Sequence, residues 1–382
     1  MLSILAKSSR FLLPALFFGY ALAANTNLVL TGEWRSIEPS LAAVMKGDVV
    51  REVEDVYKTE LPHREPSIGL LGALRYQLLG VGKPGIVVGK NEWFYTSEEF
   101  GPEINKASRL ERSVEEIVRI KNRLAKDGVH LMLVPLPHKS DVYDENLPGL
   151  HSANAGRDQY TSFVQRLTQS DIPVADTRPA LAHGKSKEPV FFRTDTHWTP
   201  HGANLVAQEV ARSVPVVHSW EATDFQLQAA DSVSFWGDLV SFVTDEDYGD
   251  LAGLEQENTR LWEAIEPETE QISDLFGADS AFPVVLVGSS YSANPNWSFA
   301  EFLKAHLAVD VLNVAEEGQG PGTPMFRYLE SDEFADEKPV LVIWEFPTRY
   351  LAQDLLWEAA PASKDPSRLA LQKPQRTGET IQ

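Results

Sequence analysis

The sequence predicts an α/β sandwich built on a mostly parallel sheet. Two nearly continuous apolar runs, residues 130–135 and 282–288, are typical of strands that are buried on both faces. Segments of helical periodicity, such as residues 113–126, alternate with these runs along the chain. Because a strand, helix, strand order produces parallel pairing with helices against the sheet, this alternation favours the α/β class.

The composition fits a globular protein and excludes several functional classes. The chain has 382 residues, and 43% of them are hydrophobic, so it can bury a full core. It has no cysteine, which excludes disulfides, thiol nucleophiles and thiolate metal sites. The net charge of -21 argues against nucleic acid as a partner. A polyanionic substrate would need a local basic or aromatic cleft.

The first 24 residues have the pattern of an export signal. Lys7 and Arg10 precede an apolar run over residues 11–20, and a small-residue cleavage pattern follows at residues 21–23. The run is shorter than the roughly 20 residues that span a bilayer, and Pro14 interrupts it. We therefore expect residues 1–24 to be a signal peptide, with a signal anchor as the alternative, and the mature protein to work outside the cytoplasm.

An N-terminal segment, residues 25–70, is expected to precede a single catalytic domain over residues 71–360. Turn residues at 89–91 predict two short strands within 86–95. The helix over 113–126 should end before Gly128 and lead into the buried strand at 130–135. A helix over 155–169 and a short strand at 174–176 follow.

The second half of the predicted domain repeats this alternation after an interruption. Thr199 as N-cap and Pro200 at the first helical position predict a helix that extends to Ser213. A strongly acidic stretch at about 221–280 is interpreted as an insertion. The remaining predicted elements are a strand at 282–288, a helix at 298–307, strands at 311–314 and 340–344, and a polar, disordered tail at 361–382.

Asp195 and His197 are the first candidates for catalysis. Residues two apart in an extended segment project to the same side, so the Asp195 carboxylate can orient the His197 imidazole. Such a pair holds one tautomer and stabilises the imidazolium that forms when histidine accepts a proton. A purely structural Asp–His pair is the alternative interpretation.

A metal site formed by Asp195, His197 and His201 is a further alternative. Two histidines four residues apart suit a zinc-binding helix. However, Pro200 places His197 before the helix and His201 in its first turn, so the two do not share a helical face. We therefore predict no metal and no other cofactor.

Ser290 is the candidate nucleophile. It lies in a Gly288-x-Ser290-x-Ser292 string directly after a buried strand, where a sharp turn can expose a serine. Together with Asp195 and His197 it supplies the nucleophile, base and orienting group that acyl transfer requires. The backbone N–H of Ser290 is a candidate oxyanion donor. Weaker candidates for substrate binding are Lys139, Trp198, Tyr291, Arg349 and Tyr350.

The strings at residues 194–198 and 288–292 resemble those of the alginate O-acetyltransferase family of SGNH-hydrolase-like proteins, which includes AlgJ and AlgX. Strings at 89–95, 135–139, 293–297 and 316–321 support the resemblance. It implies a three-layer α/β/α sandwich and a triad of Asp195, His197 and Ser290. Ser289 replaces an expected threonine, so the resemblance leaves both adjacent serines as candidate nucleophiles.

The resemblance also implies a function and partners. AlgX-like members carry a carbohydrate-binding module after the catalytic domain, whereas this chain has a short polar end, which favours the AlgJ branch. The implied activity is acetylation of mannuronate residues of alginate in the periplasm, at the inner membrane. The implied partners are a membrane-bound O-acyltransferase (AlgI-like) and a small periplasmic protein (AlgF-like). A polysaccharide acetylesterase and a non-catalytic polysaccharide-binding scaffold are the alternatives.

Overall fold

The chain forms two compact units in the computed structural model. The structure describes residues 2–31, 40–101, 106–149, 151–215, 220–266, 282–353 and 356–357. Residues 1–83 and 240–255 belong to the smaller unit, and residues 84–239 and 256–382 belong to the larger one. The predicted polar tail, residues 361–382, lies outside the described residues.

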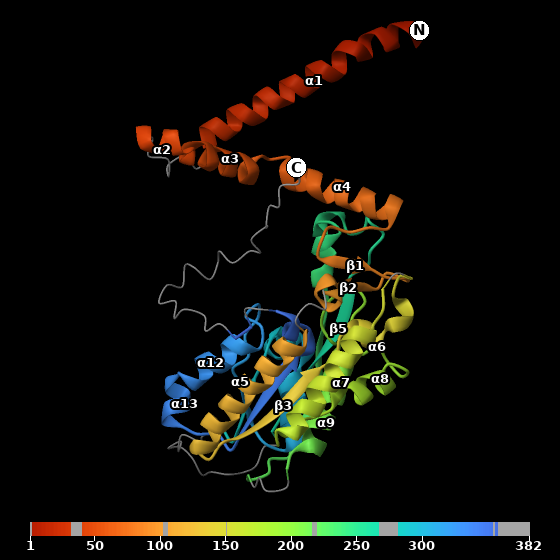
Figure 1. Cartoon of the computed structure of the whole chain (residues 1–382). Helices are drawn as coiled ribbons and strands as arrows, with labels where there is room; N and C mark the ends of the chain where they lie inside the picture. The colour runs from red at the N-terminus through yellow and green to blue at the C-terminus, as the bar shows by residue number, and fades with distance from the viewer. Residues whose placement is uncertain are drawn as a thin grey trace. The chain divides into compact units, whose positions relative to one another are not determined.

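The smaller unit is helical. Its helices are α1 (Leu2–Thr31), α2 (Leu41–Lys46), α3 (Asp48–Glu60) and α4 (Arg64–Leu79) (Figure 1). Helix α4 packs closely against the segment 240–255, because a Cβ at Gly72 would collide with the carbonyl oxygen of Val243. The Thr244 hydroxyl donates to the carbonyl of Gly69 on the same helix, at 2.8 Å. Within the described residues, no helix combines the length and the hydrophobicity that a membrane crossing requires.

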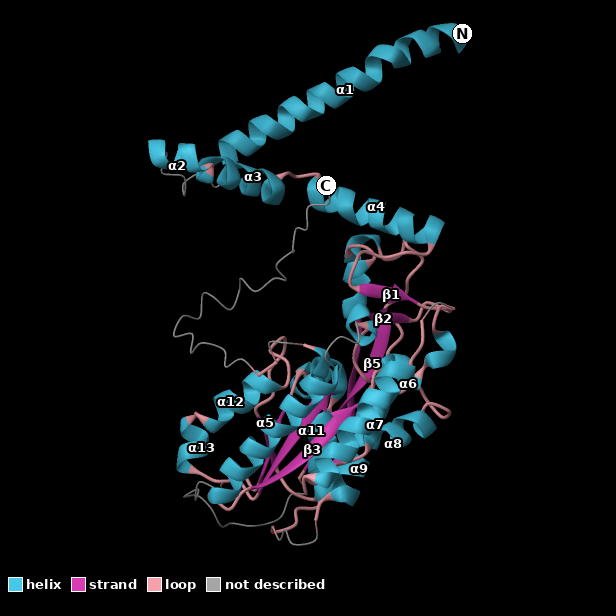
Figure 2. Cartoon of the chain, in the orientation of Figure 1, coloured by secondary structure: helices cyan, strands magenta, loops and turns pink. Residues whose placement is uncertain are grey.

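The larger unit is built on a four-stranded parallel sheet (Figure 2). The strand order is β3 (His130–Leu136), β8 (Leu341–Pro347), β6 (Val284–Val287) and β7 (Val311–Asn313). Apart from the exposed His130, every residue of β3, β6 and β8 is buried. The prediction of a parallel sheet with strands buried on both faces is confirmed.

Helices cover both faces of this sheet, and alternate strand residues contribute to two separate cores. Met132 and Val134 of β3 face one core, whereas Leu131 and Leu133 face the other. The first core is closed by α8 (Thr177–Gly184), α9 (Pro200–Ser213) and α11 (Phe299–Leu307). The second is closed by α5 (Lys106–Lys126), α7 (Asn154–Gln169), α12 (Gly322–Leu329) and α13 (Asp332–Asp336). The larger unit is therefore a three-layer α/β/α sandwich.

Two antiparallel pairs lie outside the central sheet. Strands β1 (Ile86–Val88) and β2 (Phe94–Thr96) form the predicted hairpin. Strands β4 (Gln226–Phe235) and β5 (Glu257–Ile265) pair within the acidic stretch at 221–280. The strand predicted at 174–176 forms only a single bridge, between Val174 and Leu133. Pro173 has no N–H to donate and α8 begins at Thr177, so the pairing cannot extend in either direction.

Local sequence signals fix the helix starts around the candidate site. The Thr199 hydroxyl accepts the N–H of Gly202 at 3.2 Å, and Pro200 is the first residue of α9, as predicted. Short helical turns follow two of the central strands, namely α6 (Lys139–Val142) after β3 and α10 (Ser290–Ala293) after β6. The described residues also include the 3-10 turns η2 (Ser97–Phe100), η3 (Asp144–Asn146), η4 (Asp238–Phe242), η5 (Glu246–Tyr248), η6 (Pro295–Trp297) and η7 (Thr348–Ala352).

Candidate active site

Polar residues gather at the carboxyl edge of the parallel sheet. Lys139 follows β3, Ser290 follows β6, and Arg349 follows β8. Because these strands are parallel neighbours, the three chain segments leave the sheet at the same edge, where sites form in open α/β folds. The loop between residues 190 and 199, which leads into α9, brings Asp195 and His197 to the same place.

Ser290 and His197 are in direct contact. The Ser290 Oγ lies 2.7 Å from His197 Nε2. The adjacent Ser289 is buried, and its hydroxyl bonds to Glu345 and accepts the N–H of Tyr291 at the start of α10. Of the two candidate nucleophiles, only Ser290 therefore faces the imidazole.

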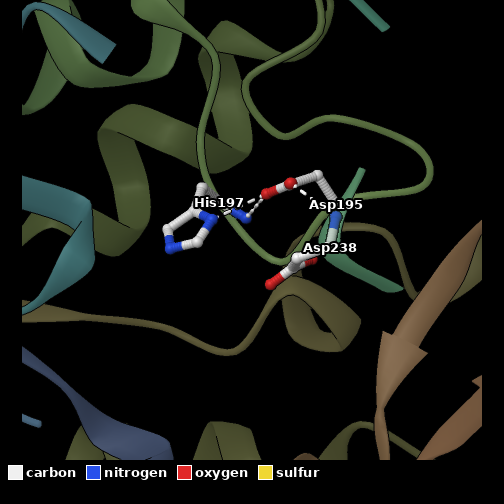
Figure 3. Close-up of side chains that lie close together, drawn as sticks. All are labelled: Asp195, His197 and Asp238. Carbon is white, nitrogen blue, oxygen red and sulfur yellow. Dashed lines mark hydrogen bonds and ion pairs between the residues drawn. The ribbon is translucent and has the colours of Figure 1, made fainter. Parts of the chain in front are cut away.

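Asp195 holds the opposite side of the imidazole (Figure 3). The His197 Nδ1 lies 2.7 Å from Asp195 Oδ1, which also accepts the backbone N–H of His197 at 2.7 Å. The backbone N–H of Asp238 donates to Asp195 Oδ2 at 2.9 Å. These bonds fix the carboxylate, so that Asp195, His197 and Ser290 form one continuous hydrogen-bonded chain. This geometry permits the histidine to accept the hydroxyl proton and the aspartate to stabilise the resulting imidazolium.

The surroundings of His197 favour the charge that this proton transfer creates. Burial opposes the imidazolium, but the charge of Asp195 and its hydrogen bond outweigh burial and raise the pKa of His197 above its ordinary value. The imidazole stacks on the ring of Trp297, with a centroid separation of 5.3 Å, and lies against the ring of Tyr291 at 4.7 Å. The two aromatic side chains restrict the orientation of the imidazole.

The sequence also left open a metal site formed by Asp195, His197 and His201. In the structure, His201 does not join Asp195 and His197. His201 Nε2 lies 3.4 Å from the carbonyl oxygen of Gly184. Asp238 instead joins Asp195 and His197, with ligand-type atoms within 4.8 Å of one another. These atoms already serve as hydrogen-bond partners, since Asp238 Oδ1 accepts the N–H and the hydroxyl of Thr196. The arrangement thus matches an orienting carboxylate network.

Lys139 does not have the position that a substrate-binding role requires. It is 1% exposed, and its ammonium donates to three backbone carbonyls, those of Phe94, Arg193 and Asp195, at 2.6, 2.9 and 2.9 Å. Burial lowers its pKa to about 8. All three donors of the ammonium are used internally, so the prediction that it contacts substrate is corrected: Lys139 ties the loop of Asp195 to β2.

The variant Lys139→Met is expected to destabilise the protein by on the order of 3 kcal/mol, because it removes the three hydrogen bonds that the buried ammonium donates to backbone carbonyls. Chemical denaturation followed by circular dichroism measures this loss. Lys185→Met is a suitable control, since that ammonium also bonds a carbonyl, that of Val142, but is partly exposed. An equal and small effect of both substitutions would contradict the tethering role of Lys139.

Three of the other predicted binding residues, Trp198, Tyr291 and Arg349, are buried. Trp198 is fully buried and donates its indole N–H to the carbonyl of Tyr291 at 3.1 Å. Tyr291 is buried and donates its hydroxyl to the carbonyl of Thr196 at 2.7 Å. Arg349 donates to the hydroxyl oxygen of Tyr291 at 3.1 Å, and its guanidinium lies over the half-buried ring of Tyr350. Trp198 and Tyr291 are therefore packing residues beneath the triad, and a substrate contact of Arg349 and Tyr350 stays a prediction.

Two acidic residues of the site were missed by the sequence interpretation. Asp238 lies in a stretch rich in acidic residues, which hides any single functional carboxylate. Glu345 lies in β8, an otherwise apolar strand, and is fully buried. A single carboxylate within such a strand was the available signal, because an ionisable residue is rarely buried without a partner.

The comparison with known proteins agrees with this fold. Residues 86–348 match the family described as SGNH hydrolase-like domain, acetyltransferase AlgX. The chain belongs to this family. Similar members include the probable alginate O-acetylase AlgJ of Pseudomonas syringae pv. tomato, which is 35% identical over 359 residues, or 91% of this chain and 89% of the relative.

Solved structures of the AlgJ and AlgX family share the fold. The O-acetyltransferase domain of Pseudomonas putida AlgJ matches with a TM-score of 0.65 at 33% identity, covering 75% of this chain and 98% of that domain. Pseudomonas aeruginosa AlgX matches with a TM-score of 0.56 at 26% identity, covering 71% of this chain and 65% of that chain. As a member of the family with this SGNH-hydrolase-like fold, the chain is an O-acetyltransferase.

Proposed function

We propose that the chain transfers acetyl groups to hydroxyls of mannuronate residues in alginate, through an acetyl-enzyme formed on Ser290. The observation that carries the mechanism is the pair of 2.7 Å hydrogen bonds that links Ser290 Oγ, the His197 ring and Asp195. The acceptor is supported by relatives of similar length named as probable alginate O-acetylases, at 35% identity.

In the first step, His197 Nε2 accepts the Ser290 proton while Oγ forms a bond to the acetyl carbonyl carbon of the donor. The backbone N–H of Ser290 is the proposed oxyanion donor. The bond from the carbonyl carbon to the donor oxygen then breaks, and the imidazolium returns its proton to that oxygen. Asp195 stays ionised throughout and stabilises the imidazolium.

In the second step, a sugar hydroxyl takes the place of the departed donor. His197, again neutral, accepts the hydroxyl proton while the sugar oxygen attacks the acetyl-enzyme. Collapse of the intermediate breaks the bond to Ser290 Oγ, which receives the proton from His197. The enzyme is thereby restored, and the polymer carries an acetyl ester.

We propose further that this reaction takes place in the periplasm, at the inner membrane. The export-signal pattern of residues 1–24 supports this location. The acetyl group is proposed to come from a membrane-bound O-acyltransferase, with a small periplasmic protein as relay. The similarity to proteins named for alginate biosynthesis supports this context.

Intact-mass spectrometry of the purified protein tests the proposal. The protein is incubated with 4-nitrophenyl acetate and then with polymannuronate. The expected result is an acetyl adduct that disappears on addition of the polymer, while ester groups appear on the polymer. An adduct that is lost only to water would indicate an acetylesterase instead of a transferase. Polymer binding with no adduct would favour a non-catalytic scaffold.

A further inference from the structure

A carboxylate is buried directly beneath the turn that presents Ser290. Glu345 Oε2 accepts three hydrogen bonds from this turn, from the Ser289 N–H at 2.8 Å, the Ser289 hydroxyl at 2.9 Å and the Ser292 hydroxyl at 3.1 Å. The Ser289 hydroxyl also lies 3.1 Å from Oε1. One side chain of β8 therefore binds the residues on both sides of Ser290.

The turn is built to admit this carboxylate closely. A Cβ at Gly288 would lie 2.6 Å from Glu345 Oε2, so a side chain at position 288 would displace it. Ser289, held by the carboxylate, also accepts the N–H of Tyr291 and so caps α10, whose first residue is Ser290. The position of Ser290 Oγ opposite His197 thus depends on the contact between Ser289 and Glu345.

We propose that Glu345, in its ionised form, is a positioning residue that holds residues 288–292 so that Ser290 Oγ faces His197. This inference rests on the proposed role of Ser290 as the nucleophile. Glu345 contacts neither the substrate nor the reacting atoms, and it acts through Ser289 and Ser292.

The hydrogen-bond pattern explains why the ionised form matters. All groups that bond to Glu345 Oε2 are donors, and an ionised carboxylate only accepts. A protonated carboxyl must itself donate, which would require a serine hydroxyl to turn around and accept. For Ser289 this rotation would compete with the cap on α10.

Arg349 and Tyr291 are a charged group and a titratable group that act on Glu345. Burial raises the pKa of Glu345 to about 7, although the hydrogen bonds of Ser289 and Ser292 and the positive charge of Arg349 favour ionisation. Burial raises the pKa of Tyr291, so that this neighbour stays neutral at physiological pH. Ionisation of Glu345 near neutral pH would therefore change how firmly the turn is held.

The variant Glu345→Gln tests this role with 4-nitrophenyl acetate as substrate. The amide is similar in shape and keeps an acceptor oxygen but cannot ionise. Above about pH 8, kcat is expected to fall roughly tenfold to a hundredfold with KM unchanged, because small misplacements of a reacting group have effects of this size. The difference from the wild type should shrink as the pH falls through about 7, where the wild-type carboxylate is itself protonated.

Glu99→Gln is the matched control. Glu99 is also a buried carboxylate that accepts two backbone N–H groups, but these belong to Lys139 and Ser140 at the start of α6. Its substitution measures how far the loss of a buried carboxylate outside the Ser290 turn lowers kcat, and this loss should be smaller than the loss in Glu345→Gln above about pH 8. Circular dichroism and thermal unfolding of each variant establish that the proteins compared are folded.

A loss in Glu345→Gln that stays constant between about pH 5 and 9 would overturn the ionised positioning role, as would an unchanged kcat. If Glu345→Gln does not fold, Ser292→Ala removes one donor and keeps the carboxylate. That variant should lower kcat, with KM unchanged and the pH dependence retained, and an unchanged kcat would again overturn the proposal. Failure of the underlying function is distinguishable, because it would appear as full activity in Ser290→Ala.

Discussion

Replacing Ser290 by alanine is expected to reduce kcat for acetyl transfer by on the order of 10⁴- to 10⁶-fold, and to abolish the acetyl adduct. The reason is geometric. Ser290 Oγ is the oxygen that contacts His197 Nε2, so its removal leaves the base without a proton to accept. Turnover of a chromogenic acetyl ester and intact-mass spectrometry measure the two effects. The fold should survive, because the Ser290 side chain is not fully enclosed in a core.

Ser289→Ala is the informative companion to this variant. It removes the neighbouring hydroxyl, which bonds to Glu345 and caps α10, but leaves the Ser290 Oγ in place. We expect slower turnover with the acetyl adduct still formed at Ser290. An adduct that survives in Ser290→Ala and disappears in Ser289→Ala would show that the wrong serine has been assigned as nucleophile.

Asp195→Asn is expected to lower kcat by on the order of 10⁴-fold with the fold intact. The asparagine can present its N–H₂ group to His197 Nδ1, which would favour the tautomer that carries its proton on Nε2. That tautomer cannot accept the Ser290 proton. Steady-state kinetics with the chromogenic ester measure the loss.

The same variant should shift the pH dependence of the residual activity. In the wild type, activity requires neutral His197, so it falls as the pH drops through the raised pKa of that imidazole, above 6.5. Without the Asp195 charge, burial dominates and lowers the pKa of His197. The acid limb of kcat/KM should therefore move to lower pH. A limb that stays in place would mean that another group controls it.

The elements that the sequence predicted well are those whose signals are local. Continuous apolar runs identify β3 and β6, because a strand covered on both faces has no polar position. A capping threonine followed by proline identifies the start of α9. The prediction of a strand at 174–176 was wrong because strand pairing depends on neighbours in space. Pro173 and the start of α8 limit the pairing to one bridge.

The candidate site shows the same division. Asp195 and His197 are two residues apart, and Ser290 follows a buried strand, so each has a signal in its own segment. Glu345 acts only across the sheet, from β8 to the turn after β6, and no short string contains both partners. The last strand was predicted to end at Trp344, so Glu345 was not assigned to it. In the structure, β8 continues through Glu345 to Pro347. Lys139 was misjudged because its three carbonyl partners come from two distant segments.

The ammonium of Lys139 lies among three backbone carbonyl oxygens, a type of ligand that also binds Ca²⁺ in proteins. Here the cation is attached to the chain through its own side chain, so it cannot exchange with the medium or be removed by a chelator. The tether on the loop of Asp195 is consequently independent of the ionic composition around the protein. The strength of the hydrogen bonds from Lys139 instead depends on pH, since the amine becomes neutral above about pH 8.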